Sequence, residues 1–165
     1  MIKSALQLVV GSTLVLAAAA ASAAPSVTKP LLVSAVIQER PGPMPRCPSQ
    51  FGGTITGAAD SALLGRSVVI STDCITPAGP LFNFSQGKMV IMTVTGEQIF
   101  ANYSGQFVPT GEGAKFVFSG ATFQITGGTG RYWRASGGGN LNGGEDMVTG
   151  LGTAELSGKI TYSGW

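Results

Sequence analysis

The chain has 165 residues, and its composition excludes several classes of protein. It contains no histidine, so histidine-based catalytic triads, histidine-ligated zinc and histidine general bases are all ruled out. Ten Lys and Arg against eight Asp and Glu, scattered singly, argue against a nucleic-acid or anionic-membrane partner. Glycine is abundant at 25 residues without a collagen-like period, which together with many Val, Ile, Thr and Phe indicates short strands and tight turns.

The N-terminal segment has the pattern of a secretory signal peptide. Lys3 precedes an apolar run over 5–21, and small residues ending at Ala23 supply a cleavage site. A membrane anchor is the alternative, but the run is short for a bilayer and rich in alanine. We therefore expect a cleaved signal peptide over 1–23 and an exported bacterial protein, secreted or periplasmic, with no membrane insertion after cleavage.

The remaining chain predicts an all-β domain with little or no helix, because no stretch keeps a helical apolar spacing. Eight strand-like segments are separated by Gly, Pro, Asn or Asp, which fits a closed antiparallel barrel or a two-sheet sandwich. We assign 24–46 to an extended leader and first strand, and 47–165 to the main domain, which that strand joins. The predicted strands are 31–38, 50–58, 66–73, 88–95, 98–107, 115–125, 133–141 and 151–162.

The chain has two cysteines, Cys47 and Cys74, which in an exported protein predict one disulfide. A hairpin of the second and third strands that sets Cys47 opposite Cys74 also sets Phe51 opposite Ile70 on an apolar face. One register therefore satisfies both the disulfide and the apolar pattern. A redox or metal role is disfavoured because no Cys-x-x-Cys spacing exists.

The stretch "TGGTGRYWRASGGG", residues 126–139, is the most distinctive in the chain. A phosphate-binding glycine loop leads into a helix, whereas here further glycines and a strand-like run follow, and Trp133 replaces the third glycine of a dinucleotide fingerprint. This favours a tight turn between strands, with glycines supplying positive φ. We expect the arginines and aromatic residues of the stretch to lie on the outside of that corner.

This stretch resembles the Gly-Gly-Thr-Gly-(Arg/Lys)-(Phe/Tyr)-x-x-Ala-x-Gly hallmark of the allene oxide cyclase and dirigent-like barrel superfamily. Segments 93–107 and 152–162 are also similar to strands of that family, so the resemblance covers most of the chain from about Gln50 onward. It implies an eight-stranded antiparallel β-barrel, commonly oligomeric, with a cavity open at one end. The matching positions are Gly127, Gly128, Thr129, Gly130, Arg131, Tyr132, Ala135 and Gly137.

The resemblance also implies a class of function. Plant members hold an apolar epoxide in the barrel and steer its ring closure, and dirigent proteins orient phenoxy radicals. We therefore expect a small apolar ligand in the barrel, with cyclisation or isomerisation as the reaction if the protein is an enzyme, without histidine, metal or cofactor. No catalytic residue is assigned by a matching motif position. The alternative is a non-catalytic, adhesive or protein-binding module with a solidly packed barrel.

Alternation along two strands selects candidate pocket residues. Tyr103 and Phe107 share one face of their strand, as Leu156 and Tyr162 do in the last strand. If these faces point inward, two tyrosine hydroxyls lie among apolar walls, an arrangement suited to an amphipathic ligand. Packing of the same residues into a filled core is the competing interpretation.

Two further features bear on surfaces and metals. In the sixth strand Phe116 and Phe118 lie on one face and Phe123 on the other, so one set is expected to be exposed and available for contact between subunits. The adjacent acids Glu145 and Asp146 lack the spaced oxygen ligands of a calcium loop, and we interpret them as a solvated turn.

Overall fold

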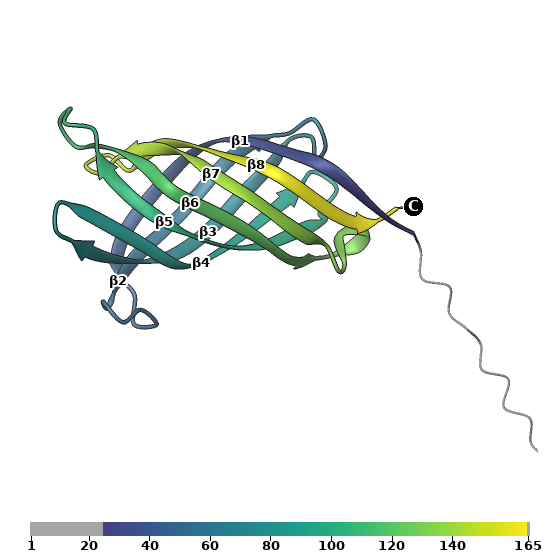
Figure 1. Cartoon of the computed structure of the whole chain (residues 1–165), viewed down its shortest axis with the longest axis horizontal. Coiled ribbons are helices and arrows are strands. Elements are labelled where there is room, and N and C mark those ends of the chain that lie inside the picture. Colours follow the sequence, from purple (N-terminus) through teal and green to yellow (C-terminus); the bar gives the residue numbers. More distant parts are fainter. Residues whose placement is uncertain (1–24, 165) are drawn as a thin grey trace, which may run out of the picture.

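The computed structural model describes residues 25–164, which form eight antiparallel strands closed into a barrel in chain order (Figure 1). This confirms the predicted all-β, eight-stranded antiparallel barrel. The one helical element among the described residues is a single 3₁₀ turn, η1 (Gly130–Tyr132). The strands are β1 (Ser26–Pro43), β2 (Phe51–Asp60), β3 (Ser67–Ala78), β4 (Leu81–Thr93), β5 (Gln98–Pro109), β6 (Lys115–Gly128), β7 (Ser136–Asp146) and β8 (Leu151–Ser163).

The first strand is longer than the sequence predicts, and the predicted leader is part of it. β1 begins at Ser26, because this end of the strand pairs with β8 from Ser26 opposite Ser163 onward. Its other end pairs with β2, so β1 lies between the second and the last strand and closes the barrel. The predicted signal peptide over 1–23 lies outside the described residues. No helix within 25–164 is long and apolar enough to cross a membrane.

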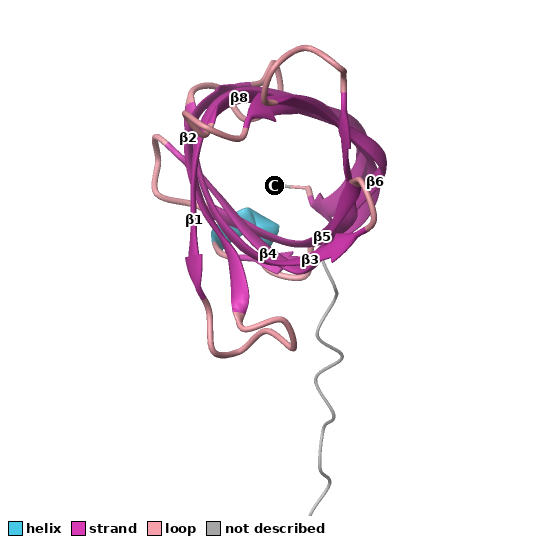
Figure 2. Ribbon diagram, turned by 90° about the vertical axis from the view of Figure 1, so that its left-hand side faces the viewer, coloured by secondary structure: helices cyan, strands magenta, loops and turns pink. Residues whose placement is uncertain are grey.

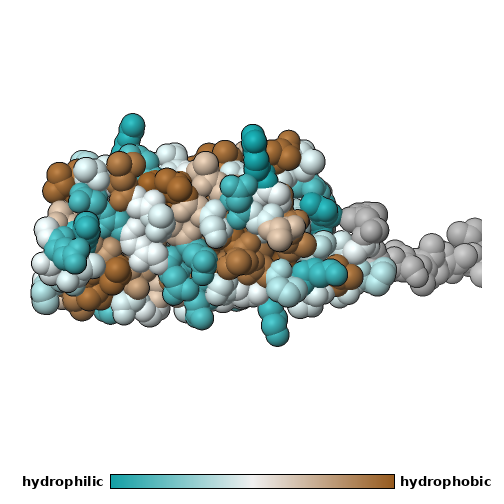
Figure 3. All heavy atoms as spheres, turned by 90° about the horizontal axis from the view of Figure 1, so that it is seen from above, coloured by the Kyte–Doolittle hydropathy of each residue, from teal (hydrophilic) through white to brown (hydrophobic). Residues whose placement is uncertain are grey.

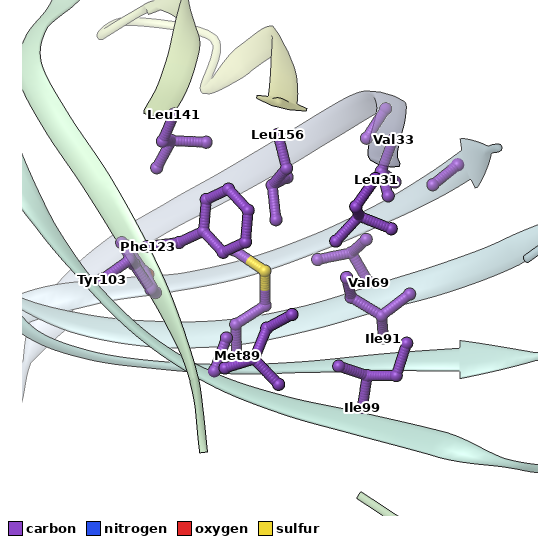
Figure 4. Packing of buried hydrophobic residues seen from close by; sticks show 14 of the residues in the cluster. Leu31, Val33, Val69, Met89, Ile91, Ile99, Tyr103, Phe123, Leu141 and Leu156 are labelled. Carbon is purple, nitrogen blue, oxygen red and sulfur yellow. The ribbon is translucent and has the colours of Figure 1, made fainter. Parts of the chain in front are cut away.

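Period-two alternation places apolar side chains inside the barrel. In β1, Leu31, Val33, Ala35 and Ile37 are buried, while the residues between them are exposed. The other strands contribute in the same way, and Figure 4 shows leucine, isoleucine, valine, methionine and phenylalanine side chains from different strands converging on one interior. Removal of this apolar surface from water is the main force that closes the sheet.

The disulfide between Cys47 and Cys74 is present, but the strand register predicted from it is wrong. β3 meets β2 with Cys74 opposite Gly52, and Phe51 and Ile70 are both largely exposed instead of forming an inward pair. The reason is that Cys47 lies in the loop between β1 and β2, outside either strand. The disulfide therefore ties this loop to β3 and does not report a pair of residues in the sheet.

The aromatic residues of β6 all reach the interior, so the expectation that one set is exposed is also wrong. Phe123 is buried, and Phe116 and Phe118 are half-buried and pack against the core. The pairing of β6 with β7 shifts register between Val117 and Thr122, and Gly120 within this segment has a φ of 57°. The bulge inserts a residue and reverses which positions face inward, so both aromatic sets point into the barrel.

The two ends of the barrel differ. At one end lie η1 and the turns that follow β2, β4 and β6, and Tyr132 of η1 is fully buried there. Figure 2, which looks along the barrel, shows η1 within the outline of the strands. At the other end lie the loops that follow β1, β3, β5 and β7, at the left of Figure 1. The glycine-rich stretch thus closes one end of the barrel.

Gly128 should be required for this closed end. A Cβ atom there would lie 2.7 Å from Tyr132 Cβ and in contact with the Gln98 carbonyl oxygen, whereas one at Gly42 of β1 would meet nothing within 4 Å. We expect Gly128→Ala to lower the free energy of unfolding by about 1–3 kcal/mol, and Gly42→Ala to change it by well under 1 kcal/mol. Urea unfolding followed by tryptophan fluorescence measures both. Equal stability of the two variants would contradict the close packing at η1.

Candidate functional site

A cavity lies inside the barrel, away from η1. Its free volume is about 40 Å³, and the hollow that includes its solvent-open part measures about 480 Å³. The walls are mostly apolar side chains from all parts of the sheet, including Ile55, Met89, Phe84 and Leu141. The free volume has room for about three water molecules, so the interior is largely, but not completely, filled.

Four ionisable side chains face this cavity beside the Ser71 hydroxyl, and they come from alternate strands. Glu39 lies on β1, Asp73 on β3, Tyr103 on β5 and Glu145 on β7. Each occupies an inward position of its strand, and each has less than a tenth of its surface exposed. Three carboxyl groups and a phenol are therefore gathered within an otherwise apolar interior.

Glycines on the strands between them make room for these side chains. A Cβ at Gly53 of β2 would lie 2.7 Å from the Glu39 carboxyl carbon, and one at Gly87 of β4 would lie 2.6 Å from a Tyr103 ring carbon. A Cβ at Gly152 of β8 would lie 2.6 Å from Glu145 Cβ. Because these glycines have no side chains, groups two strands apart reach one another over them.

Asp73 is held by hydrogen bonds on both oxygens. The Tyr103 hydroxyl donates to Oδ2 at 3.0 Å, and the Gly53 amide donates to Oδ1 at 3.2 Å. Burial raises the pKa of Asp73 to about 6, although these two hydrogen bonds and the charge of Arg46 oppose the rise. Burial, followed by the charge of Asp73, raises the pKa of Tyr103 well above its ordinary value. Tyr103 therefore stays protonated and acts as a hydrogen-bond donor.

Glu39 and Glu145 interact directly with one another. Glu39 Oε1 and Glu145 Oε2 are buried and have no hydrogen-bond partner among the described residues. The two side chains lie within hydrogen-bonding reach of one another, so a proton on Glu39 can bridge the two carboxyls. Burial first, and then the neighbouring Glu145, raise the pKa of Glu39 to about 10. Burial also raises the pKa of Glu145, to about 7, while the hydrogen bond from Glu39 acts in the opposite direction. Between about pH 7 and pH 10 the pair therefore shares one proton.

This arrangement places an acid and a base side by side at neutral pH. Glu39 is a neutral carboxylic acid, Asp73 is mostly ionised, and Glu145 is divided between the two forms. Carboxyl groups whose environments separate their pKa values in this way are suited to donate a proton at one atom of a ligand and remove one at another.

Three of the four predicted pocket residues line the cavity. Tyr103, Phe107 and Leu156 do so, but Tyr162 does not. Its ring packs at 5.2 Å from the ring of Tyr132 at the closed end of the barrel. The prediction for Tyr162 identified the correct face of β8 but the wrong end of the strand.

The acids of this site were not among the predicted site residues. The interpretation of Glu145 as part of a solvated turn is wrong, since only 6% of its surface is exposed. Its neighbour Asp146 does belong to the turn and accepts hydrogen bonds from the Val148 and Thr149 amides. The alternation of β1 contains the missed signal: the buried positions Val33, Ala35 and Ile37 continue with the same spacing to Glu39.

The residues of the glycine-rich motif have structural positions away from this cavity. The Thr129 hydroxyl accepts a hydrogen bond from the Gln98 amide at 2.8 Å, and Arg131 forms an ion pair with Glu97 at 3.2 Å. Contrary to expectation Tyr132 is buried, whereas Trp133 is exposed. Ala135 is buried next to η1, Gly128 packs against Tyr132, and three of the glycines have positive φ: Gly127, Gly130 and Gly137.

The fold and the cavity together define a small closed β-barrel with an acidic, proton-sharing interior. No protein-family model matches the chain, and a search of curated proteins finds no significant relative. Among residues 25–164, no group of three or more His, Cys, Asp or Glu side chains is arranged to hold a metal ion. The cavity and its side chains are therefore the features that bear on function.

The buried carboxyls should make stability fall as pH rises. Their pKa values are raised on folding, so the stability they confer is complete below their ordinary values of 3.8 to 4.5 and is lost as pH rises through about 6, 7 and 10. The Glu39→Gln amide can donate the same hydrogen bond without ionising. We expect this variant to exceed the wild type in unfolding free energy at pH 8 by on the order of 1–3 kcal/mol.

Urea unfolding at pH 5 to 9 measures this effect. Glu155→Gln, which removes an exposed carboxyl of β8, is the matched control and should leave the pH dependence unchanged. A Glu39→Gln profile parallel to that of the wild type would show that Glu39 does not hold its proton in the folded protein.

Proposed function

We propose that the protein binds a small, largely apolar molecule in the cavity and isomerises or cyclises it by acid–base catalysis. The observation that carries the proposal is the cluster of Glu39, Asp73 and Glu145, which holds an acid beside a base inside apolar walls. A purely structural core has no need of three buried carboxyls, because replacing buried ionisable groups with apolar ones is often neutral or stabilising.

The proposed chemistry moves protons and needs no net change in the composition of the ligand. Glu39 donates its proton to an electron-rich atom of the ligand, such as a carbonyl or epoxide oxygen. The carboxylate of Asp73 or Glu145 removes a proton from a neighbouring carbon, and transfer of a proton from that group back to Glu39 completes the cycle. The apolar walls exclude water and so strengthen each of these interactions.

We also propose that the protein works outside the cytoplasm. The disulfide between Cys47 and Cys74 supports this, because such bonds persist in oxidising compartments. The pattern of a signal peptide over 1–23 agrees with it. The resemblance of the glycine-rich stretch to the allene oxide cyclase and dirigent-like barrels adds support to the choice of a cyclisation or isomerisation over other acid–base reactions.

Filling the cavity should abolish ligand binding. Ala154 of β8 lines the cavity, and Ala154→Phe places a ring in the free space. Native mass spectrometry of the protein purified from its own host should show a bound small molecule in the wild type and none in this variant. The exposed neighbour Thr153→Phe is the control and should keep the ligand. An equal ligand load in all three proteins would place the binding site elsewhere.

The outer face of the barrel favours a second candidate function, binding of another protein subunit. Val36 of β1 and Val68 and Ile70 of β3 are each about half exposed or more, and Ala58 of β2 pairs with both valines. These residues form an apolar area on neighbouring strands. Figure 3, which views the barrel from above, shows that apolar residues lie among polar ones on its outer surface. Apolar areas of this kind mark contacts between proteins.

Sedimentation velocity tests this candidate. If the apolar area joins two copies of the chain, Val68→Lys should shift the protein to monomer, while the exposed Val94→Lys in the β4–β5 turn should not. A wild-type protein that stays monomeric at high concentration would remove self-association as a function of this face.

A further inference from the structure

The cavity has a marked imbalance of charge. The ionisable groups facing Glu39 are Glu145 from β7, Asp73 from β3 and Tyr103 from β5, and no lysine or arginine within 25–164 lines the cavity. Between them, β2 and β8 contribute glycine and apolar side chains. The wall is therefore able to accept hydrogen bonds and positive charge, and its described residues supply no cationic group to pair with an anion.

The cation that acts on Asp73 lies on the outside of the sheet. The positive charge of Arg46 lowers the pKa of Asp73. Its guanidinium, however, donates hydrogen bonds to Thr72 Oγ1 at 3.1 Å and to the Gln86 carbonyl oxygen at 3.2 Å. Both of these hydrogen bonds are exposed to solvent. Arg46 therefore leaves the carboxyls of Glu39 and Glu145 without a cationic partner.

Two carboxyl oxygens of the cavity lack partners of their own. Glu39 and Glu145 are 4% and 6% exposed, and one buried oxygen of each has no hydrogen-bond partner other than the proton that the two share. A buried acceptor without a donor lowers the stability of the folded protein. A ligand that brings donors to both oxygens therefore gains more binding free energy here than at a site whose acceptors are already paired. An ammonium group brings up to three N–H donors together with the missing charge.

Aromatic rings line the same cavity. Phe84, Phe107 and Phe118 all face it, and their ring centroids lie 4.7 to 5.7 Å apart. The faces of such rings attract cations, and this attraction is strongest where water is excluded. Carboxylates on one part of the wall and aromatic rings on another form a setting that suits an organic cation.

We propose that the ligand carries a basic nitrogen, and that its ammonium group replaces the proton shared by Glu39 and Glu145. This inference rests on the proposed function, since it takes the cavity to be the ligand site. In the complex with an amine, the ammonium group takes the place of Glu39 as the acid, and Asp73 remains the base. The free volume of about 40 Å³ accepts a head group of a few heavy atoms, and the apolar remainder of the ligand occupies the wider hollow open to solvent. A neutral alcohol of the same shape gains no ion pair, and a carboxylate is repelled.

The proton balance follows from this exchange. Before binding, Glu39 holds one proton and Glu145 accepts it in a hydrogen bond. The protonated amine enters, both carboxyls end in the ionised form, and the proton of Glu39 passes to solvent. Binding of one ammonium group at pH 8 therefore releases up to one proton, and the affinity rises with pH until the amine itself loses its proton.

Isothermal titration of n-butylamine, n-butanol and butyrate into the full mature chain tests the inference. At pH 8 we expect the amine to bind at least tenfold more tightly than the alcohol, and butyrate not to bind. Repeating the titration in buffers of different ionisation enthalpy should show release of between half and one proton per amine. The amine affinity should rise several-fold from pH 6 to pH 8.

Variants separate the ion pair from simple occupancy. Glu39→Gln should weaken amine binding at least tenfold, abolish proton release and leave butanol binding within twofold, and Glu145→Gln should weaken amine binding similarly. The exposed control Glu155→Gln should behave as the wild type. Butanol binding as tightly as the amine, or amine binding without proton release, would overturn the inference while leaving the cavity as a ligand site. If neither compound binds, both this inference and the proposed cavity site fail.

Discussion

A carboxyl group inside a closed barrel is stable when it is neutral or when it accepts hydrogen bonds from nearby donors. This constraint accounts for the internal arrangement of the protein. Asp73 meets it by accepting from the Tyr103 hydroxyl and the Gly53 amide. Glu39 and Glu145 meet it by sharing one proton. The acids come from separate strands, so the satisfaction of each one depends on the barrel being closed.

The glycines of neighbouring strands are the counterpart of these acids. Gly53 and Gly152 leave the space in which Glu39 and Glu145 lie, and Gly87 does the same for the Tyr103 ring. The abundance of glycine in this chain thus has two origins. One is the need for positive φ in turns and bulges, as at Gly120 and Gly130. The other is the need for empty positions opposite polar side chains in the interior.

The sequence predicts the barrel well because strand alternation and turn residues are local properties. The inward face of β8 and the pairing of Cys47 with Cys74 follow from residue types and spacing alone. The register of β2 and β3 does not, because Cys47 lies in a loop whose path depends on the folded structure. The inward orientation of Phe116 and Phe118 cannot be predicted from the sequence for a similar reason, since a bulge near Gly120 reverses the alternation within one strand.

The candidate site is harder to predict than the fold because it is assembled from four strands. Glu39 and Asp73 each follow a run of inward positions, but nothing within one strand indicates that an acid on another strand will lie beside it. Their meeting depends on the register and tilt of the whole barrel, which are long-range properties. A single strand also gives no reason to place Tyr162 at the end opposite Tyr103, although the two residues occupy equivalent faces.

The burial of Tyr132 at one end of the barrel limits how a ligand can reach the interior. Since η1 closes that end and a packed layer of apolar side chains lies behind it, the interior is a dead end and not a channel. Whatever enters must leave by the same mouth, beside the loop that the disulfide ties to β3. In the proposed reaction, entry and exit are then mutually exclusive, so a product would obstruct the next substrate until it departs.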